Sequence, residues 1–175
     1  MNLTEKIMRT ALQKLEEDLS GPLTLIIGGG GAMILAHHFP LSTSDIDAIP
    51  KGMDLATLDV HVKKIAAELS LPGDWLNPYF VTFSHTLPSD YGTRLIEVFR
   101  GKNLTAMALS KDEMLIMKCF AHRQKDVAHA KALIKAGAHV EFVEKHIDML
   151  AEKRIPGTQA ALDFLYDILD QLDGG

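Results

Sequence analysis

Two short segments near the N-terminus contain residue types that together bind phosphate and divalent metal. Four consecutive glycines, 28–31, follow the apolar run Leu23–Ile27, and Asp45 and Asp47 come after them along the chain. Glycines let backbone N–H groups approach an anion closely, and a helix that starts there adds the positive end of its dipole. Carboxylates two residues apart on a strand point to the same face and can hold Mg²⁺ or Mn²⁺ beside a bound phosphate. This pattern predicts a nucleoside triphosphate bound together with a divalent metal ion.

Each half of this pattern has a simpler interpretation when it stands alone. A glycine run before a helix is often a tight turn that allows the helix to contact the sheet, and Asp-x-Asp is often a solvated strand edge. No Gly-Lys-Ser/Thr follows the glycines, so they do not form a Walker loop, and contiguous glycines do not match a Rossmann fingerprint. The order strand, glycines, helix, loop, strand favours the combined interpretation, in which metal ions neutralise phosphate charge during phosphoryl or nucleotidyl transfer.

The elements that must position these residues follow from hydrophobic periodicity and turn residues. We expect a first helix whose apolar residues run from Leu3 to Leu19, with Asn2 and Glu5 as a capping box. The predicted strands are Leu23–Ile27, Asp45–Ile49, Tyr79–Ser84, Arg94–Phe99 and Leu104–Leu109. The further predicted helices are Ala32–His38, Leu55–Leu69 with Asp54 as its cap, one that follows the cap Ser110 and runs to Ala121, Asp126–Ala136, Val140–Lys153 and Thr158–Leu172.

These elements predict an α/β (α+β) fold with a short mixed sheet flanked by helices. Residues 1–109 would form the α/β core with its N-terminal helix, and residues 110–175 would form a helical tail packed on that core. A length of 175 residues is consistent with one compact domain.

Composition excludes several classes of protein. Eighteen basic residues against 23 acidic ones give a net charge of −5, so the whole chain is not a basic protein that wraps nucleic acid. Cys119 is the only cysteine, which excludes a disulfide framework and a cysteine-rich zinc site, and we expect it in the core. The eight histidines lack ligand spacing. The charged N-terminus predicts no signal peptide, and no apolar run is long enough to span a bilayer, so we expect a cytoplasmic protein with no membrane partner.

Two motifs resemble a known superfamily. Gly30-Gly31, eleven further residues and then Thr43-Ser44-Asp45-Ile46-Asp47 resemble the signature of the DNA polymerase β-like nucleotidyltransferases. The segment 110–126, with Lys118, Ala121, Arg123 and Lys125-Asp126, is similar to the AbiEii-type toxin branch and its uncharacterised bacterial relatives. Trp75-Leu76-Asn77 also resembles those relatives. The resemblance covers roughly residues 24–135.

The resemblance implies a nucleotidyltransferase that moves a nucleoside monophosphate from a nucleoside triphosphate to an acceptor hydroxyl of RNA or protein. Asp45 and Asp47 would hold the metal ion and act in catalysis. Such toxins are neutralised by a separate antitoxin protein, which makes an antitoxin a possible partner. The residues expected to bind the nucleotide are Gly30, Gly31, Thr43, Ser44, Lys118, Arg123 and Asp126.

The charged residues of the second motif also suit this role by their chemistry. Lys118 and Arg123 can supply positive charge to a triphosphate, and Asp126 can orient either of them or cap the following helix. If one helix runs through the motif, Lys118, His122 and Asp126 form a single stripe. The alternative is an ion-paired, solvated helix face.

The third carboxylate of the superfamily has one good candidate, Glu97. Strand alternation would place it on the face shared with Leu95 and Phe99, where a carboxylate among apolar neighbours must be paired. Without this carboxylate the attacking hydroxyl loses its expected general base. The sequence also departs from the family pattern at Leu41, Ser44 and His129. A catalytically degenerate protein that binds nucleotide, RNA or protein is therefore the alternative hypothesis.

Overall fold

The computed structural model describes residues 2–175, apart from the side chains of residues 79–82. Its internal contacts divide the chain into two units, which are described separately. The first unit consists of Met1–Thr82 and Leu95–Leu109, and the second consists of Phe83–Arg94 and Ser110–Gly175. The short segment Phe83–Arg94 thus groups with the residues from Ser110 onward.

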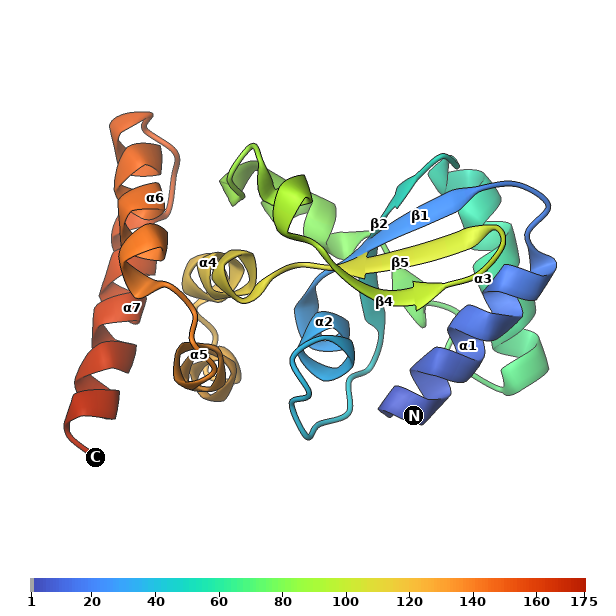
Figure 1. Cartoon of the computed structure of the whole chain (residues 1–175), viewed down its shortest axis with the longest axis horizontal. Helices are drawn as coiled ribbons and strands as arrows, with labels where there is room; N and C mark the ends of the chain where they lie inside the picture. The colour runs from blue at the N-terminus through green and yellow to red at the C-terminus, as the bar shows by residue number, and fades with distance from the viewer. Residues whose placement is uncertain (1) are drawn as a thin grey trace. The chain divides into compact units, whose positions relative to one another are not determined.

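The first unit is built on a five-stranded mixed sheet, as predicted (Figure 1). Its order is β3-β2-β1-β5-β4. β1 pairs antiparallel with β2 and parallel with β5, β2 pairs parallel with β3, and β4 pairs antiparallel with β5. The strands are β1 (Leu23–Ile27), β2 (Ile46–Lys51), β3 (Leu76–Asn77), β4 (Ile96–Arg100) and β5 (Leu104–Ala108). The predicted strand Tyr79–Ser84 is wrong, because this segment forms the 3₁₀ helix η1 (Tyr79–Thr86). Aromatic and β-branched residues favour strands only where a sheet is available to pack on.

Three helices belong to this unit, namely α1 (Glu5–Asp18), α2 (Gly29–Leu35) and α3 (Leu55–Leu69). The N-cap of α1 is Thr4, whose side chain accepts the N–H of Ile7, so the predicted cap Asn2 is wrong. Asp54 caps α3 as predicted by accepting the N–H of Thr57 at 2.9 Å. α1 and α3 contact each other, and α1 also contacts α2 and β5 (Figure 1).

The strand register separates the sheet into two different faces. One face carries small and aliphatic side chains that are all buried, which are Leu23, Leu25 and Ile27 of β1 and their partners Leu104, Ala106 and Ala108 of β5. The opposite face carries Ile26, its neighbour Met107 on β5 and, on β2, Ile49. Asp47 shares this second face because it lies two residues from Ile49 on the same strand.

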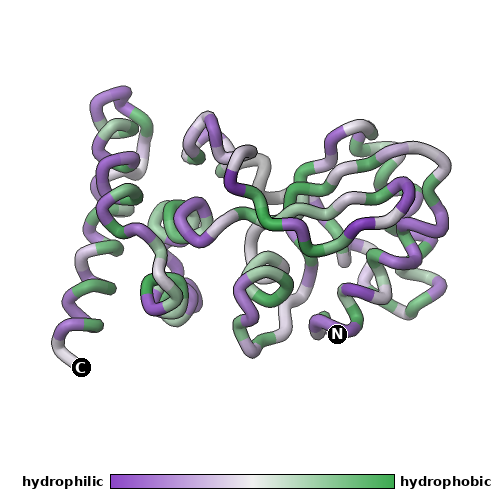
Figure 2. The backbone as a smooth tube through the Cα atoms, in the orientation of Figure 1, coloured by the Kyte–Doolittle hydropathy of each residue, from purple (hydrophilic) through white to green (hydrophobic). Residues whose placement is uncertain are grey.

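The second unit is helical and is organised around α4 (Lys111–Ala121), which contacts α5 (Asp126–Lys135), α6 (Val140–Glu152) and α7 (Thr158–Asp173). All four helices were predicted, with boundaries within a residue or so. Hydrophobic and hydrophilic residues alternate along α6 and α7 in Figure 2, as expected for helices that bury one side. α4 is different, because every residue from Asp112 to Cys119 is buried.

Ion pairs and a hydrogen bond explain why residues 83–94 group with these helices. Arg94, the last residue of η2 (Tyr91–Arg94), donates from Nε to Oε1 of the fully buried Glu113 on α4 at 2.7 Å. Nε2 of His146 on α6 lies 2.7 Å from the carbonyl oxygen of Thr86. These long-range contacts bring the segment to the helical unit although it precedes β4 in the chain. Among the helices of residues 2–175, none is both long and apolar enough to cross a membrane.

Candidate functional site

The two aspartates lie where β2 begins, beside the turn that leads from β1 into α2 (Figure 1). β1 and β2 are antiparallel neighbours, with Ile27 opposite Ala48. The pairing continues past the end of β1, because the N–H of Gly28 donates to the carbonyl oxygen of Asp47 at 2.9 Å. The topology therefore brings the glycine turn and Asp47 together at one end of the sheet.

The carboxylate of Asp47 lies directly against Gly29. A Cβ atom on Gly29 would overlap Oδ2 of Asp47 and would lie 3.2 Å from its Cγ. Gly29 also has a φ angle of +56°, a left-handed conformation that side chains other than glycine rarely adopt. Glycine is thus required here twice, for its backbone conformation and for the close approach of the carboxylate. Gly29 was not among the residues predicted for the site.

Asp45 is held by two neutral donors. Nδ2 of Asn77 donates to Oδ2 of Asp45 at 2.7 Å, and Oγ of Ser44 donates to Oδ1 at 3.2 Å. Asn77 reaches Asp45 from β3, where it is the register partner of Asp47. Asn77 was not predicted as a site residue, and its only signal in the sequence was its place in Trp75-Leu76-Asn77.

Both carboxylates are half-buried, while Ile46 and Ala48 beside them in the chain are buried. This alternation is the one expected of a strand with one covered face, and it places Asp45 and Asp47 on the other side of β2. An ionised carboxylate has about four lone-pair sites. The hydrogen bonds from Asn77 and Ser44 use only some of those sites on Asp45, and neither donor carries a charge that would compete with a cation.

The donor set fits a magnesium or manganese ion. Mg²⁺ is usually bound by one or two carboxylates, with substrate phosphate oxygens and water completing its octahedral shell. Asp45 and Asp47 supply such a pair, and the lack of a Cβ atom on Gly29 allows the Asp47 carboxylate to lie against the glycine turn. Within the described part of the chain, no group of three or more His, Cys, Asp or Glu side chains is arranged to hold a metal ion.

Gly30 and Gly31, the other predicted residues of the glycine turn, contact different parts of the unit. Gly30 lies against Thr43, because a Cβ atom on Gly30 would be 2.7 Å from Thr43 Oγ1. Thr43 in turn pairs through its backbone with Leu3, with N–O distances of 2.6 and 3.1 Å. Gly31 is buried against the sheet, where its Cβ would meet methyl groups at 3.3 and 3.4 Å, so it allows α2 to pack. The first turn of α2 leaves the N–H groups of residues 29–31 without an acceptor inside the helix.

Glu97 does not join the two aspartates. It lies on the edge strand β4, and β1 and β5 separate β4 from β2. Three strand spacings correspond to about 14 Å between backbones. The side chain of Glu97 is exposed, and its Oε2 accepts from Nη2 of Arg100 at 2.5 Å. The usual third carboxylate is therefore not supplied by Glu97 in this structure.

The predicted apolar surroundings of Glu97 are also wrong. Glu97 pairs with Met107, whereas Phe99 pairs with Ala106, because the register shifts between residues 97 and 99. Such a bulge inserts one unpaired residue and reverses the facing of the side chains beyond it. Glu97 and Phe99 therefore lie on opposite faces of the sheet.

The charged residues of the second motif form a cluster within the helical unit. Asp126 is fully buried and accepts from Lys118 Nζ at 2.9 Å and from Arg123 Nε at 2.7 Å. α4 ends at Ala121, and His122 turns the chain with a φ angle of +35°. The predicted single stripe is therefore wrong, and the turn folds Asp126 back onto Lys118 instead.

Burial and charge shift the pKa values in this cluster. Burial lowers the pKa of Lys118 even though Asp126 favours its charged form. For Asp126, burial raises the pKa, but hydrogen bonds and charge from Arg123 and Lys118 outweigh it, and the net pKa is lowered. Burial, reinforced by the charge of Lys118, lowers the pKa of His129 to about 4, so this histidine is neutral at pH 7. Cys119 is buried as predicted, and burial raises the pKa of its thiol to about 12.

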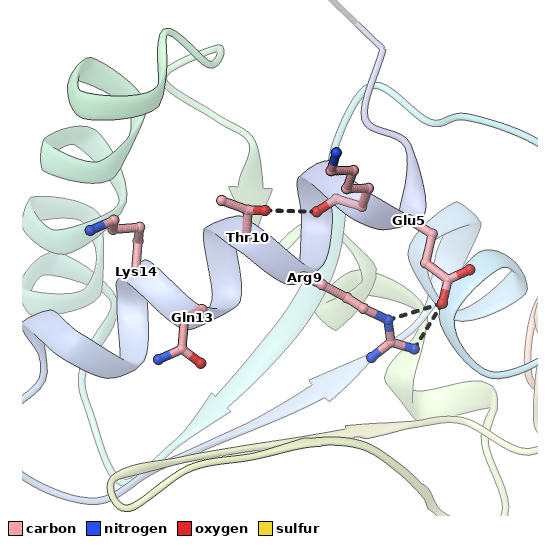
Figure 3. A pocket seen from close by; sticks show the side chains of 6 residues that line it. Glu5, Arg9, Thr10, Gln13 and Lys14 are labelled. Atoms are coloured by element: carbon pink, nitrogen blue, oxygen red, sulfur yellow. Dashed lines mark hydrogen bonds and ion pairs between the residues drawn. The ribbon is translucent and has the colours of Figure 1, made fainter.

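A separate hollow lies along α1 and contains none of the predicted site residues (Figure 3). Arg9 at its centre pairs with Glu5 at 2.9 Å and donates from Nη1 to the carbonyl of Val98 on β4. The hollow is lined by Glu5, Lys6, Arg9, Thr10, Gln13 and Lys14. Its lining has one acidic and three basic side chains, of which Arg9 pairs with Glu5 and Lys14 pairs with Glu17, and we assign it no role.

Comparison with known proteins gives one match. The family model described as "Nucleotidyltransferase of unknown function (DUF6036)" matches residues 4–155. No curated protein and no solved structure shows significant similarity to the chain. The matched range contains the glycine turn, both aspartates, Asn77 and the Lys118–Asp126 cluster.

Proposed function

Because the chain belongs to this family of nucleotidyltransferases, we propose that it moves a nucleoside monophosphate from a nucleoside triphosphate to an acceptor hydroxyl on RNA or protein. The observation that carries the proposal is the placement of the Asp47 carboxylate against Gly29, with Asp45 held beside it. Nothing in the packing of a small sheet requires two acidic side chains at this position. A role in binding a cation and a polyphosphate accounts for both of them.

Each part of the site has a role in this proposal. Asp45 and Asp47 would hold Mg²⁺ or Mn²⁺, which when bound neutralises charge on the triphosphate. In this proposal the N–H groups at the start of α2, which have no acceptor inside the helix, would donate to phosphate oxygens, and Gly30 and Thr43 contact each other beside them. Ser44 orients Asp45 through its hydroxyl.

The finer assignment is to the AbiEii-type branch, as a cytoplasmic toxin with an antitoxin partner. Its support is the pattern Lys118, Arg123 and Asp126, whose members contact one another closely, together with Trp75-Leu76-Asn77. In this proposal Arg123, whose side chain is half exposed, is the residue of this cluster that supplies positive charge, while Asp126 orients it by accepting from its Nε. Expression should then arrest growth, and Asp45→Ala should relieve the arrest. Growth unaffected by the wild-type chain rejects the toxin assignment.

One observation favours the alternative of a catalytically degenerate binding protein. Glu97 lies three strands from Asp47, and the described residues offer no metal-binding group of three acidic side chains. The acceptor hydroxyl would then lack the carboxylate that usually removes its proton. Such a protein would bind the nucleotide through the same two aspartates and transfer nothing.

Two measurements test the proposal and separate it from this alternative. The first is calorimetric titration with each nucleoside triphosphate in the presence of Mg²⁺, for the wild type and for the double variant Asp45→Asn/Asp47→Asn. Asp59→Asn is the matched control, since Asp59 is an exposed carboxylate on α3 that pairs with Lys63 of the same helix. We expect metal-dependent binding in the wild type and the control, and none in the double variant. Equal affinity in the double variant would exclude the site.

The second measurement is the transfer of labelled nucleotide to total RNA or to protein, with and without Mg²⁺. Metal-dependent label that disappears in the double variant supports the transferase. Binding without any transfer supports the degenerate protein.

A further inference from the structure

We propose that Asn77 is a positioning residue of this site, which holds the Asp45 carboxylate beside that of Asp47 so that both face one divalent cation. This inference rests on the proposed function, because it assigns a role toward the metal ion that Asp45 and Asp47 would bind.

The position of Asn77 relates it to both aspartates. Its side-chain Nδ2 donates to Oδ2 of Asp45 at 2.7 Å, and its backbone is the register partner of Asp47 across the parallel β2–β3 pair. Residues paired in this way have their side chains on the same face. One amide is thus adjacent to both carboxylates of the proposed metal site.

The backbone that carries Asn77 is firmly anchored. The N–H of Ile46 donates to the carbonyl of Trp75 at 2.7 Å. Trp75 itself is completely buried, and its indole N–H donates to the carbonyl of Val62 on α3 at 2.9 Å. Leu76 is 5% exposed. The buried Trp75, hydrogen-bonded to α3, therefore fixes the position of the two-residue strand β3, and with it the backbone of Asn77.

An amide suits this position better than a charged group. Two neighbouring carboxylates repel each other when no cation is present, and a hydrogen-bond donor can hold one of them in place. A lysine at position 77 would supply a donor but would also neutralise Asp45 and compete with the metal ion. An amide donates without cancelling charge. Groups that orient a metal ligand in this way typically contribute about 10- to 100-fold in metal affinity or activity.

The test is the affinity for Mn²⁺ alone, measured from the electron paramagnetic resonance signal of the free ion. Four proteins form a double-mutant cycle: the wild type, Asn77→Ala, Asp45→Asn and the combined variant Asp45→Asn/Asn77→Ala. The matched control is Asn103→Ala, because Asn103 is in the same unit and its Nδ2 donates to a backbone carbonyl, that of Leu19, at 2.8 Å. Thermal unfolding of each protein reports whether the fold is intact.

We expect Asn77→Ala to weaken Mn²⁺ binding about 10- to 100-fold, whereas Asn103→Ala leaves it unchanged. Once Asp45 is replaced by asparagine, Asn77→Ala should cause no further loss, because Asn77 acts through Asp45. Asn77→Lys should weaken binding more than Asn77→Ala, since it adds a competing cation.

Three results would overturn the inference. Wild-type affinity in a folded Asn77→Ala protein, while Asp45→Asn weakens binding, leaves the proposed function standing and removes the role of Asn77. Equal losses from Asn77→Ala in both backgrounds show that Asn77 acts on the fold and not through Asp45. Absence of Mn²⁺ binding in the wild type removes the proposed function and this inference with it.

Discussion

Replacing Gly29 by alanine should damage the proposed metal site more than the fold. Gly29 has a φ angle of +56°, and a Cβ atom there would overlap Oδ2 of Asp47. The left-handed conformation costs alanine roughly 1–2 kcal/mol relative to glycine. Heavy atoms in contact sit about 3.5–4 Å apart, so relief of the overlap displaces the Asp47 carboxylate by on the order of 1 Å. A displacement of this size can cost about 100-fold where geometry decides the chemistry.

The matched control is Gly137→Ala. Gly137 has a φ angle of +98°, and nothing lies within 4 Å of where its Cβ would stand. This variant therefore suffers backbone strain without a displaced side chain. Both variants should lose roughly 1–2 kcal/mol of unfolding free energy in urea, and only Gly29→Ala should lose Mn²⁺ binding. Normal Mn²⁺ affinity in a folded Gly29→Ala protein would refute the argument that this glycine and Asp47 form one site.

Three further sets of variants test the interactions that stabilise each unit internally. Asp126→Ala leaves Lys118 buried without its carboxylate and should lower the free energy of unfolding in urea by about 3–5 kcal/mol. Lys118→Met leaves Asp126 paired with Arg123 and should lower it less. Equal losses in the two variants would contradict this account. Trp75→Phe removes one buried hydrogen bond and should lower the unfolding free energy by about 1 kcal/mol, with the fluorescence of the only tryptophan lost and the circular dichroism spectrum retained. Burial opposes ionisation of Glu16, but backbone N–H groups of the β4–β5 turn outweigh it and lower the pKa of the carboxyl below 4.5. The stabilising contribution of Glu16 is thus present above pH 4.5 and is lost as the pH falls through the pKa of the folded state. Glu16→Gln should therefore make the melting temperature decline less steeply as the pH is lowered. An unchanged decline would exclude Glu16 as its source.

Local patterns were sufficient where a residue's role depends on its neighbours in the chain. The cap Asp54 and the span of α3 were predicted without error, because the capping side chain lies three residues from the N–H that it accepts. The strand Leu23–Ile27 followed from a short apolar run before glycines, and Asp45 and Asp47 were found from their spacing. At α1 two possible caps lie close together, and the structure uses Thr4 in place of Asn2.

Long-range pairing decided what local patterns missed. The bulge between residues 97 and 99 depends on how β4 meets β5, and it separated Glu97 from the apolar face on which alternation had placed it. Asn77 was not predicted to lie in a strand, because a two-residue strand has no periodicity to detect, and only its pairing with β2 brings it to Asp45. Residues 83–94 joined the helical unit through Arg94 and Glu113, which are 19 positions apart.

By itself, the sequence determined that two carboxylates lie on one side of a strand that follows a glycine turn, because this depends only on residue type and short spacing. It also determined most helices, since their hydrogen bonds close within four residues. The tertiary structure alone decided which groups complete the site: it brought Gly29 against Asp47 and Asn77 to Asp45, and it kept Glu97 three strands away. The physical reason is that strand order and register are set by packing across the whole sheet, so no local stretch of sequence contains them.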